Sequence, residues 1–304
     1  MTRWSALFLA FAVLAFGAVA QAIPFTAATD IETRQVTLPS SAALTFRGAI
    51  AMRPPFAAFG GLSGMAVDGD HLQLVSDRGL WVRFRPVIQG GLLRGAEEAA
   101  SAPILNDAGA PVTKGGQDAE DIAPGGWVSF EGDHRIDRFD VPGGPVVETL
   151  RHPDWSKLRS NGGLEGVARD SQGRIWAIAE RSGGETTPFP VFIWDGAGWA
   201  TKELPRGDSY AITSATFAPD GAMYLIERRF GFLTGFRTRV RRVTWGAGRV
   251  PVDDEVILSL GPSADNLEAV VFLSIENRPH LLLASDDNFQ LLQRNILALY
   301  EVTG

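Results

Sequence analysis

Acidic residues recur at two positions of a repeated sequence unit, and carboxylates are the side chains in this chain best suited to chemistry. The first position lies near the start of an apolar stretch and holds Glu120, Glu165 and Glu268. The second position closes the next apolar stretch, and its acids are Asp77, Glu131, Glu180, Glu227 and Asp286. Carboxylates that are brought together repel one another and raise each other's pKa unless a positive charge compensates. We therefore expect a positive charge wherever these acids converge.

A metal ion is one candidate for that positive charge. The acids that we predict as its ligands are Glu120, Asp121, Glu165, Glu268 and Asp286. Ligand sets made only of oxygen suit Ca²⁺ or Mg²⁺. A zinc site is not expected, because the chain has no cysteine and its four histidines lack the H-E-x-x-H spacing. The alternative for each single acid is structural, since a buried carboxylate can accept hydrogen bonds from backbone amides of a neighbouring segment.

Arginine is the other candidate, because it directly follows the closing acid in several units. The residues that we predict as catalytic are these acid–arginine pairs, Asp77 with Arg78, Glu180 with Arg181 and Glu227 with Arg228. The chain has only three lysines, so most of its positive charge is the planar guanidinium group, which suits phosphate and carboxylate. The alternative for any exposed arginine is an ordinary solvated surface charge.

The elements that must position these residues form an internal repeat. Its aligned positions are Ser63, Glu120, Glu165, Ser214 and Glu268, which lie 57, 45, 49 and 54 residues apart. In each unit a tight turn follows, then a second stretch rich in β-branched and aromatic residues, then the acid. A period of about 40 to 50 residues is typical of β-propellers. The sequence therefore predicts an all-β propeller in which the acids of both positions face one mouth.

The number of blades depends on how the remaining sequence is used. Five units are explicit, residues 80–104 carry additional strand-like sequence, and residues 34–50 and 295–302 could pair to complete one more blade. We therefore expect six blades, with five as the alternative. Because no linker or change of composition divides the chain, we predict one propeller domain over residues 23–304.

The first 22 residues are typical of a secretory signal peptide. Arg3 precedes the apolar run 6–16, and small residues follow at Ala18, Ala20 and Ala22. We expect cleavage near Ala20 or Ala22 and a periplasmic or secreted protein, with an uncleaved membrane anchor as the alternative. Removing Arg3 leaves 27 basic and 35 acidic residues, a net charge of −8. This charge argues against binding to nucleic acid or anionic membranes. We expect a monomer without stable membrane insertion.

Several of these motifs resemble those of a known family. They are Gly-Gly-Leu-Ser-Gly-Met (60–65) with Val-Ser-Asp-Arg-Gly (75–79), Asp-Ala-Glu-Asp-Ile (118–122), Gly-Leu-Glu-Gly-Val-Ala (163–168) with Ala-Glu-Arg (179–181), and Asn-Leu-Glu-Ala (266–269) with Ser-Asp-Asp-Asn (285–288). In this order, over about residues 56–290, they resemble the phytase-like domain family, also described as esterase-like activity of phytase. The resemblance implies a β-propeller that hydrolyses phosphate esters, with Ca²⁺ held by carboxylates at the mouth.

Three functions are consistent with these observations. The first is a Ca²⁺-dependent phosphoric-ester hydrolase acting on a small-molecule substrate, in which Arg78, Arg181 or Arg228 steadies the phosphate. The second is a lactonase or carboxylesterase that uses one metal ion in the channel. The third is a periplasmic binding or scaffold propeller without catalysis, in which the acids are structural.

Overall fold

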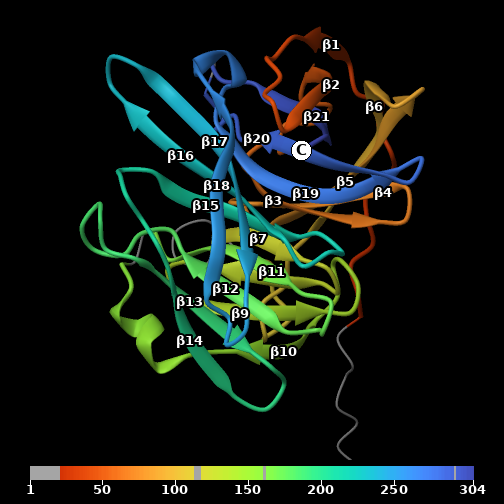
Figure 1. The fold of residues 1–304 in the computed structure, drawn as a ribbon. Helices are drawn as coiled ribbons and strands as arrows, with labels where there is room; N and C mark the ends of the chain where they lie inside the picture. The colour runs from red at the N-terminus through yellow and green to blue at the C-terminus, as the bar shows by residue number, and fades with distance from the viewer. Residues whose placement is uncertain (1–20, 113–117, 160–161, 291) are drawn as a thin grey trace, which may run out of the picture.

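The computed structural model describes residues 21–304, apart from 113–117, 160–161 and 291. In this part of the chain, β-strands form five sheets around a common axis, and the helices are two 3-10 turns, η1 (Pro153–Lys157) and η2 (Pro262–Ala264). The predicted all-β propeller is confirmed (Figure 1). Neither described helix is long and apolar enough to cross a membrane. Residues 1–20, which make up most of the predicted signal peptide, lie outside the described residues.

Four of the five blades are each built from four consecutive antiparallel strands. Blade 1 contains β3 (Leu62–Asp68), β4 (His71–Ser76), β5 (Leu80–Gln89) and β6 (Leu92–Pro103). Blade 2 contains β7 (Ala119–Ala123), β8 (Trp127–Phe130), β9 (Arg135–Phe139) and β10 (Val146–Leu150). Blade 3 contains β11 (Leu164–Arg169), β12 (Ile175–Ala179), β13 (Phe189–Trp194) and β14 (Trp199–Leu204). Blade 4 contains β15 (Ala211–Phe217), β16 (Met223–Gly231), β17 (Gly235–Trp245) and β18 (Pro251–Leu260).

Blade 5 joins the two ends of the described chain. Its strands from the C-terminal part are β19 (Leu267–Ile275), β20 (Arg278–Ser285) and β21 (Asn295–Val302), and those from the N-terminal part are β1 (Thr33–Val36) and β2 (Leu44–Met52). The order is β1-β2-β21-β20-β19, so β21 pairs with β20 on one side and with β2 on the other. The ends of the chain therefore do pair, as the sequence predicted.

The preferred prediction of six blades is wrong, and the alternative of five is confirmed. The paired ends complete the blade that already contains β19 and β20, because those two strands need partners on their outer edge. The additional strand-like sequence of residues 80–104 forms β5 and β6, the outer hairpin of blade 1. Both segments are thus outer strands of blades that the repeat had already counted.

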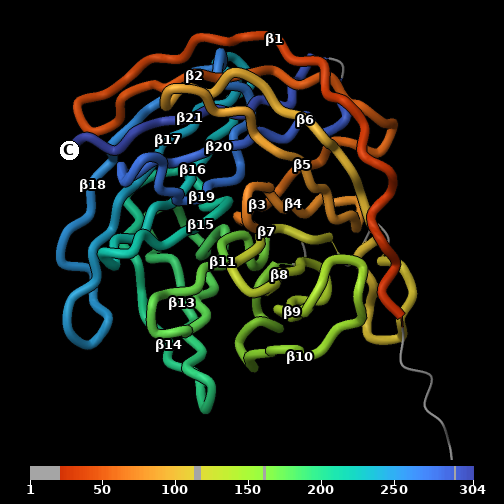
Figure 2. The backbone as a smooth tube through the Cα atoms, turned by 90° about the vertical axis from the view of Figure 1, so that its right-hand side faces the viewer, coloured from red at the N-terminus to blue at the C-terminus, as the bar shows by residue number. Residues whose placement is uncertain are grey.

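The core lies between the blades. Figure 2 shows β3, β7, β11, β15 and β19 around the centre, with β1, β6, β10, β14 and β18 at the periphery. Five apolar clusters fill the spaces between neighbouring blades, one for each pair. Strands such as β8 and β12 are apolar along most of their length because both faces of their blades are covered in this way. This packing leaves the inner strand ends and the connecting loops to position polar side chains.

Candidate metal centre

A β-bulge near the start of each inner strand sets the direction of the repeated acids. The register with the second strand shifts at this point in all five blades. The residues inside the bulges are Ser63, Glu120 with Asp121, Glu165, Thr213 and Glu268. A bulge bends its strand and re-aims the side chain at that position. The alignment from sequence was one residue off in blade 4, where Thr213 and not Ser214 occupies the bulge.

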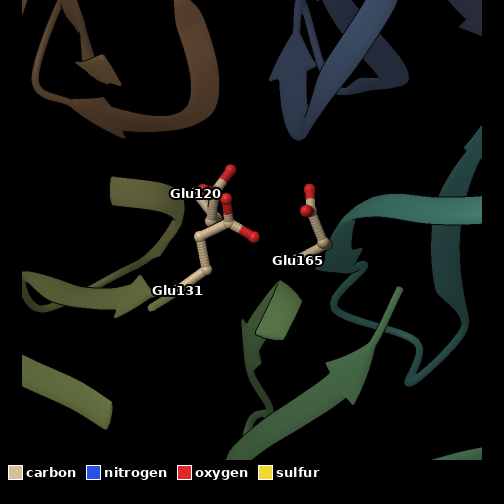
Figure 3. A group of neighbouring side chains, drawn as sticks. All are labelled: Glu120, Glu131 and Glu165. Carbon is tan, nitrogen blue, oxygen red and sulfur yellow. The ribbon is translucent and has the colours of Figure 1, made fainter. Parts of the chain in front are cut away.

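Three glutamates from two neighbouring blades converge beside the centre of the propeller. Glu120 from the β7 bulge and Glu131, which follows β8, belong to blade 2, and Glu165 comes from the β11 bulge of blade 3 (Figure 3). One carboxylate oxygen of each lies within 4.8 Å of the others. We call these residues the acidic triad. Glu120 is buried, and Glu131 and Glu165 are partly buried.

Burial and mutual repulsion make the triad hold its protons tightly. Burial raises the pKa of Glu120 well above its usual range, and Glu165 and Glu131 raise it further. Burial likewise raises the pKa of Glu165, with a further rise from Glu180 and a partial opposing effect from Arg228. The pKa of Glu131 is also raised by burial, although the N–H of Gly162 donates to its Oε2 at 2.8 Å. Within the described residues, no member of the triad forms an ion pair.

Gly162 explains how the connecting loop passes between two of these acids. Its φ of +96° lies in the left-handed region, and a Cβ atom there would come within 2.3 Å of Oε2 of Glu180. Only glycine fits both constraints without strain. The loop can therefore donate its N–H to Glu131 while leaving room for the carboxylate of Glu180.

Glu268, in contrast, already has a cationic partner. Its Oε1 forms an ion pair with Arg228 and accepts a hydrogen bond of 2.6 Å from Nδ2 of Asn266. Nη1 of Arg228 also donates to Oδ1 of Asn266 at 2.9 Å. Burial raises the pKa of Glu268, and Arg228 and Asn266 oppose this rise. Glu268 therefore lies beside the triad, and Arg228 provides the positive charge that the sequence predicted for it.

Two further acids, Asp77 of blade 1 and Asp286 of blade 5, lie close enough to Glu268 to interact with it electrostatically. Burial and the nearby Glu268 raise the pKa of Asp286 to about 8, although its Oδ1 accepts a hydrogen bond of 2.7 Å from the N–H of Asn288. Asp77, which follows β4, contributes to the same electrostatic environment. Arg78 is exposed, and its guanidinium carbon lies 3.2 Å from the centre of the Phe289 ring.

Asp121 points elsewhere and connects three inner strands. Its Oδ1 accepts from the N–H of Ile122 at 2.9 Å and from Oγ of Ser214 at 3.1 Å. Its Oδ2 accepts from the N–H of Val167 at 3.0 Å and from that of Ala215 at 3.1 Å. Asp121 therefore accepts hydrogen bonds from backbone amides of neighbouring segments, which is the structural role considered as the alternative to metal binding. A metal-binding role for this residue stays a prediction.

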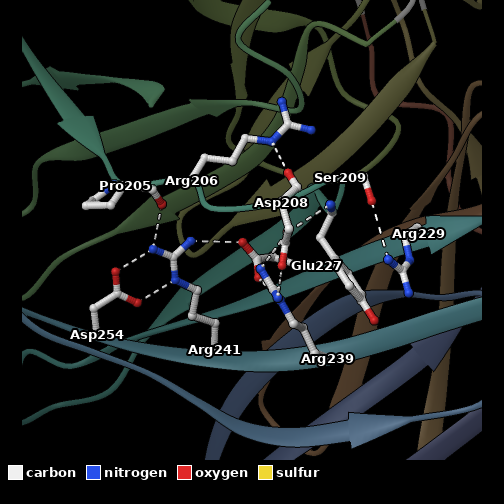
Figure 4. A network of polar contacts seen from close by, with 10 residues as sticks. Pro205, Arg206, Asp208, Ser209, Glu227, Arg229, Arg239, Arg241 and Asp254 are labelled. Carbon is white, nitrogen blue, oxygen red and sulfur yellow. Dashed lines mark hydrogen bonds and ion pairs between the residues drawn. The ribbon is translucent and has the colours of Figure 1, made fainter. Parts of the chain in front are cut away.

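Glu227 is the centre of a network of ion pairs in blade 4 (Figure 4). Its side chain is fully buried and forms ion pairs with Arg239 and, at 2.9 Å, with Arg241. Arg239 pairs in addition with Asp208 at 2.6 Å, and Arg241 pairs with Asp254. The network thereby joins β16 and β17 to residues 205–208, the segment that leads into β15. A catalytic role for Glu227 stays a prediction.

One predicted pair, Glu180 with Arg181, lines a pocket at the mouth together with Arg228, and the pair Asp77 with Arg78 does not border it. Glu180 and Arg181, 3.1 Å apart, border a cavity of about 340 Å³ together with Arg228, Arg229 and Ser209. Arg181 is exposed and Glu180 is buried. A larger cavity of about 710 Å³ is lined by residues of β1, by the end of β2 and by residues that follow β20, and no member of the triad borders it.

Glu131 is the member of the triad that was not predicted as a ligand from the sequence. Glu131 was recognised as a closing acid of the repeat but was not chosen as a ligand, although it occupies the same position as Glu180. The signal that could have identified it is the sequence spacing, because Glu120 and Glu131 flank one hairpin and their strands are antiparallel. Such a pair must lie at the same end of its blade.

Solved structures with a similar fold share little sequence identity with this chain. The fold is similar to a luciferin-regenerating enzyme, with 14% identity, a TM-score of 0.44, and coverage of 82% of this chain and 94% of that chain. It is also similar to the PQQ-bound aldose sugar dehydrogenase from Streptomyces coelicolor, with 14% identity, a TM-score of 0.46 and coverage of 91% and 100%. For the α-L-arabinofuranosidase from Podospora anserina, the identity is 9%, the TM-score 0.46, and the coverage 90% and 98%. A search of curated proteins found no match.

The sequence itself matches a family profile over most of its length. The match covers residues 57–289, which include all the inner strands and every acid of the predicted site. The family is named Phytase-like and described as "Esterase-like activity of phytase". The resemblance inferred from the motifs is thereby confirmed, and the chain belongs to the phytase-like family.

Proposed function

We propose that this protein is a metal-dependent hydrolase of phosphate esters, with Ca²⁺ bound by the acidic triad. The observation that carries the proposal is the convergence of Glu120, Glu131 and Glu165 without an ion-pair partner among the described residues. A bound cation would remove the mutual repulsion that raises the pKa of these groups. Membership of the phytase-like family supports hydrolysis as the reaction class.

The donor set fits a hard divalent cation. All three side chains offer carboxylate oxygens, which Ca²⁺ and Mg²⁺ prefer, and the set includes no histidine or thiolate that would favour zinc. Ca²⁺ is the better candidate because it tolerates irregular oxygen geometry, whereas Mg²⁺ demands a near-ideal octahedron. Glu268 and Asp286 remain predicted additional ligands.

The chain's own residues would bind and orient the substrate. Arg228 and Arg181 line the mouth pocket next to the acids, so their guanidinium groups could hold the phosphate oxygens. Glu268 and Asn266 hold Arg228 in place, so its guanidinium group is already positioned when substrate binds. A bound cation would supply Lewis acidity and a more acidic water molecule.

We propose export to the periplasm or medium on the basis of the N-terminal sequence.

The test combines calcium-dependent melting with a phosphatase assay. Ca²⁺ should raise the melting temperature of the wild type, since a ligand at 100 times its Kd adds about 2.7 kcal/mol to stability. Glu120→Gln and Glu165→Gln should lose this rise together with phosphate release from an aryl phosphate. Glu203→Gln, at an exposed position of β14, is the matched control and should behave as the wild type.

Two outcomes would contradict the proposal. Melting that is indifferent to Ca²⁺ would exclude the metal centre and favour the scaffold. Calcium-dependent cleavage of an aryl acetate or a lactone, without release of phosphate from any ester tested, would identify the carboxylesterase or lactonase instead.

A further inference from the structure

The hairpin between β16 and β17 ends in an apolar tip that faces solvent. Phe232 and Leu233 each expose 93% of their surface, and Phe230 exposes 63%. Large apolar side chains exposed this fully and side by side are unusual on a soluble domain and mark an interaction surface. In Figure 1 the hairpin, drawn in cyan, extends beyond the body of the propeller at the upper left.

The tip is held on a regular ribbon rather than on an irregular loop. Pairing of β16 with β17 continues to Gly231 opposite Gly235, and the rings of Phe230 and Phe236 lie 4.9 Å apart. The base of the ribbon is fixed by Glu227, which binds Arg239 and Arg241 inside blade 4. The protein therefore presents the apolar tip in a defined direction.

The charge around the tip is positive, although the whole chain is acidic. Residues 228–252 contain seven arginines and no acid, against a net charge of −7 for the chain. Four of these arginines, Arg228, Arg239, Arg241 and Arg242, form ion pairs with carboxylates outside this segment. Arg229 and Arg237, on either side of the tip, are exposed and form no ion pair with any described residue. Apolar side chains next to two exposed arginines without carboxylate partners are suited to the boundary between lipid acyl chains and anionic headgroups.

Another highly exposed apolar side chain lies at the same end of the propeller as the tip. The three large apolar residues that reach 93% exposure among the described residues are Phe232, Leu233 and Leu292. Leu292 lies between β20 and β21, and this connection and the β16–β17 hairpin both follow the second strand of their blade. They therefore project from the same end of the propeller, which is also the end that carries the acidic triad.

We propose that the β16–β17 tip docks this protein onto an anionic lipid surface, with the mouth of the propeller facing the lipid. Phe232 and Leu233 enter the interfacial region, and Arg229 and Arg237 contact the headgroup phosphates. A second copy of the chain is a poorer occupant, because pairing two identical tips would bring their arginines together. The proposal does not rest on hydrolysis at the mouth.

The test is co-sedimentation with lipid vesicles. Wild-type protein should bind vesicles of phosphatidylcholine mixed with phosphatidylglycerol, bind pure phosphatidylcholine more weakly, and lose affinity as salt increases. The double variant Phe232→Ser/Leu233→Ser should bind at least tenfold more weakly, and Arg237→Gln should reduce the preference for phosphatidylglycerol. All variants are compared in one background, because the apolar run of residues 6–16 would itself bind lipid if retained.

The matched control is Val252→Ser, which removes a 68% exposed apolar side chain at the opposite end of blade 4 and should leave binding unchanged. Unaltered melting temperatures show that the variants remain folded. Equal binding by the double variant, or no preference for phosphatidylglycerol at low salt, overturns the proposal. Dimers in solution that disappear in the double variant overturn it as well, because the tip would then be a protein interface.

Discussion

At the scale of single residues, adjacent acids of one motif have different roles. Glu120 and Asp121 share the bulge of β7, yet Glu120 faces two other carboxylates while Asp121 accepts four hydrogen bonds. The two side chains point in different directions from the bulge, which bends the strand and re-aims the side chains at this position. Their substitutions should therefore have different effects on stability.

Asp121→Asn should destabilise the protein by about 3 kcal/mol. The amide NH₂ of asparagine would face backbone N–H groups in place of one carboxylate oxygen, and each buried donor left without an acceptor costs about 1–3 kcal/mol. Glu120→Gln, its neighbour, should leave the metal-free stability unchanged or raise it, because it removes repulsion within the triad. Urea unfolding in the presence of a chelator measures both. A stable Asp121→Asn variant would contradict the structural role.

The metal-free protein should lose stability as the pH rises from about 4 to about 8. Folded Asp286 keeps its proton up to a pKa of about 8, whereas the unfolded chain releases it near pH 4. The folded state therefore binds more protons within this window, and raising the pH favours unfolding. Asp286→Asn should flatten the dependence, although Glu120 and Glu165 act in the same direction.

Urea unfolding with a chelator at pH 5.5 and pH 8.5 checks this sign. Carboxylates whose pKa is lowered in the folded state, such as Asp170, lose their contribution to stability only below about pH 4. They therefore do not change the difference in stability between pH 5.5 and pH 8.5. Higher stability at pH 8.5 than at pH 5.5 in the metal-free wild type would contradict the assignment.

At the scale of elements, the β16–β17 hairpin combines a buried anchor with an exposed tip. Its base contains Glu227 between two arginines, and its end carries Phe232 and Leu233. The net charge of the chain argues against anionic membranes, but net charge is a property of the whole surface. The local excess of arginine on one ribbon determines what the tip can approach.

Glu227→Gln should destabilise the protein by about 3 kcal/mol, because it leaves the buried Arg241 and the partly buried Arg239 without their shared carboxylate. Glu255→Gln, which removes an exposed ion pair with Arg242 on the same blade, is the control and should change stability by less than about 0.5 kcal/mol. Urea unfolding measures both variants. A large loss of phosphatase activity with unchanged stability would instead support the predicted catalytic role of Glu227.

At the scale of the whole molecule, the ring is closed by β21. This strand lies between β20 and β2 and so joins the two ends of the chain within blade 5. Its side chains Ile296 to Tyr300 are fully buried and belong to the apolar clusters on both sides of the blade.

Deleting residues 295–304 should therefore abolish cooperative unfolding. The deletion exposes the edges of β20 and β2 and opens two apolar clusters, so the remaining strands lose the packing that fixes the ring. Deleting residues 303–304 alone removes one backbone hydrogen bond, from Thr303 to Ala43, and should leave a cooperative transition. Calorimetry distinguishes the two cases. A sharp transition in the longer deletion would show that the ring does not depend on closure by β21.

The sequence by itself determined the propeller architecture and the membership of the phytase-like family. Turn residues, apolar stretches and acids recur at one period, so propeller, inner strands and carboxylate-rich mouth could all be predicted from local patterns. The pairing of residues 34–50 with 295–302 was also predictable, because both are strand-like segments without local partners.

Only the tertiary structure decided which acids meet and how many blades there are. Five blades result because the paired ends serve as outer strands of a blade already counted, and strand order between distant segments is not encoded in a local pattern. Glu131 joins Glu120 and Glu165, while Asp121 and Glu227 are held by other donors, because bulges and neighbouring blades set the side-chain directions. The repeat supplies equivalent acids, and their different partners across the blade interfaces give them different roles.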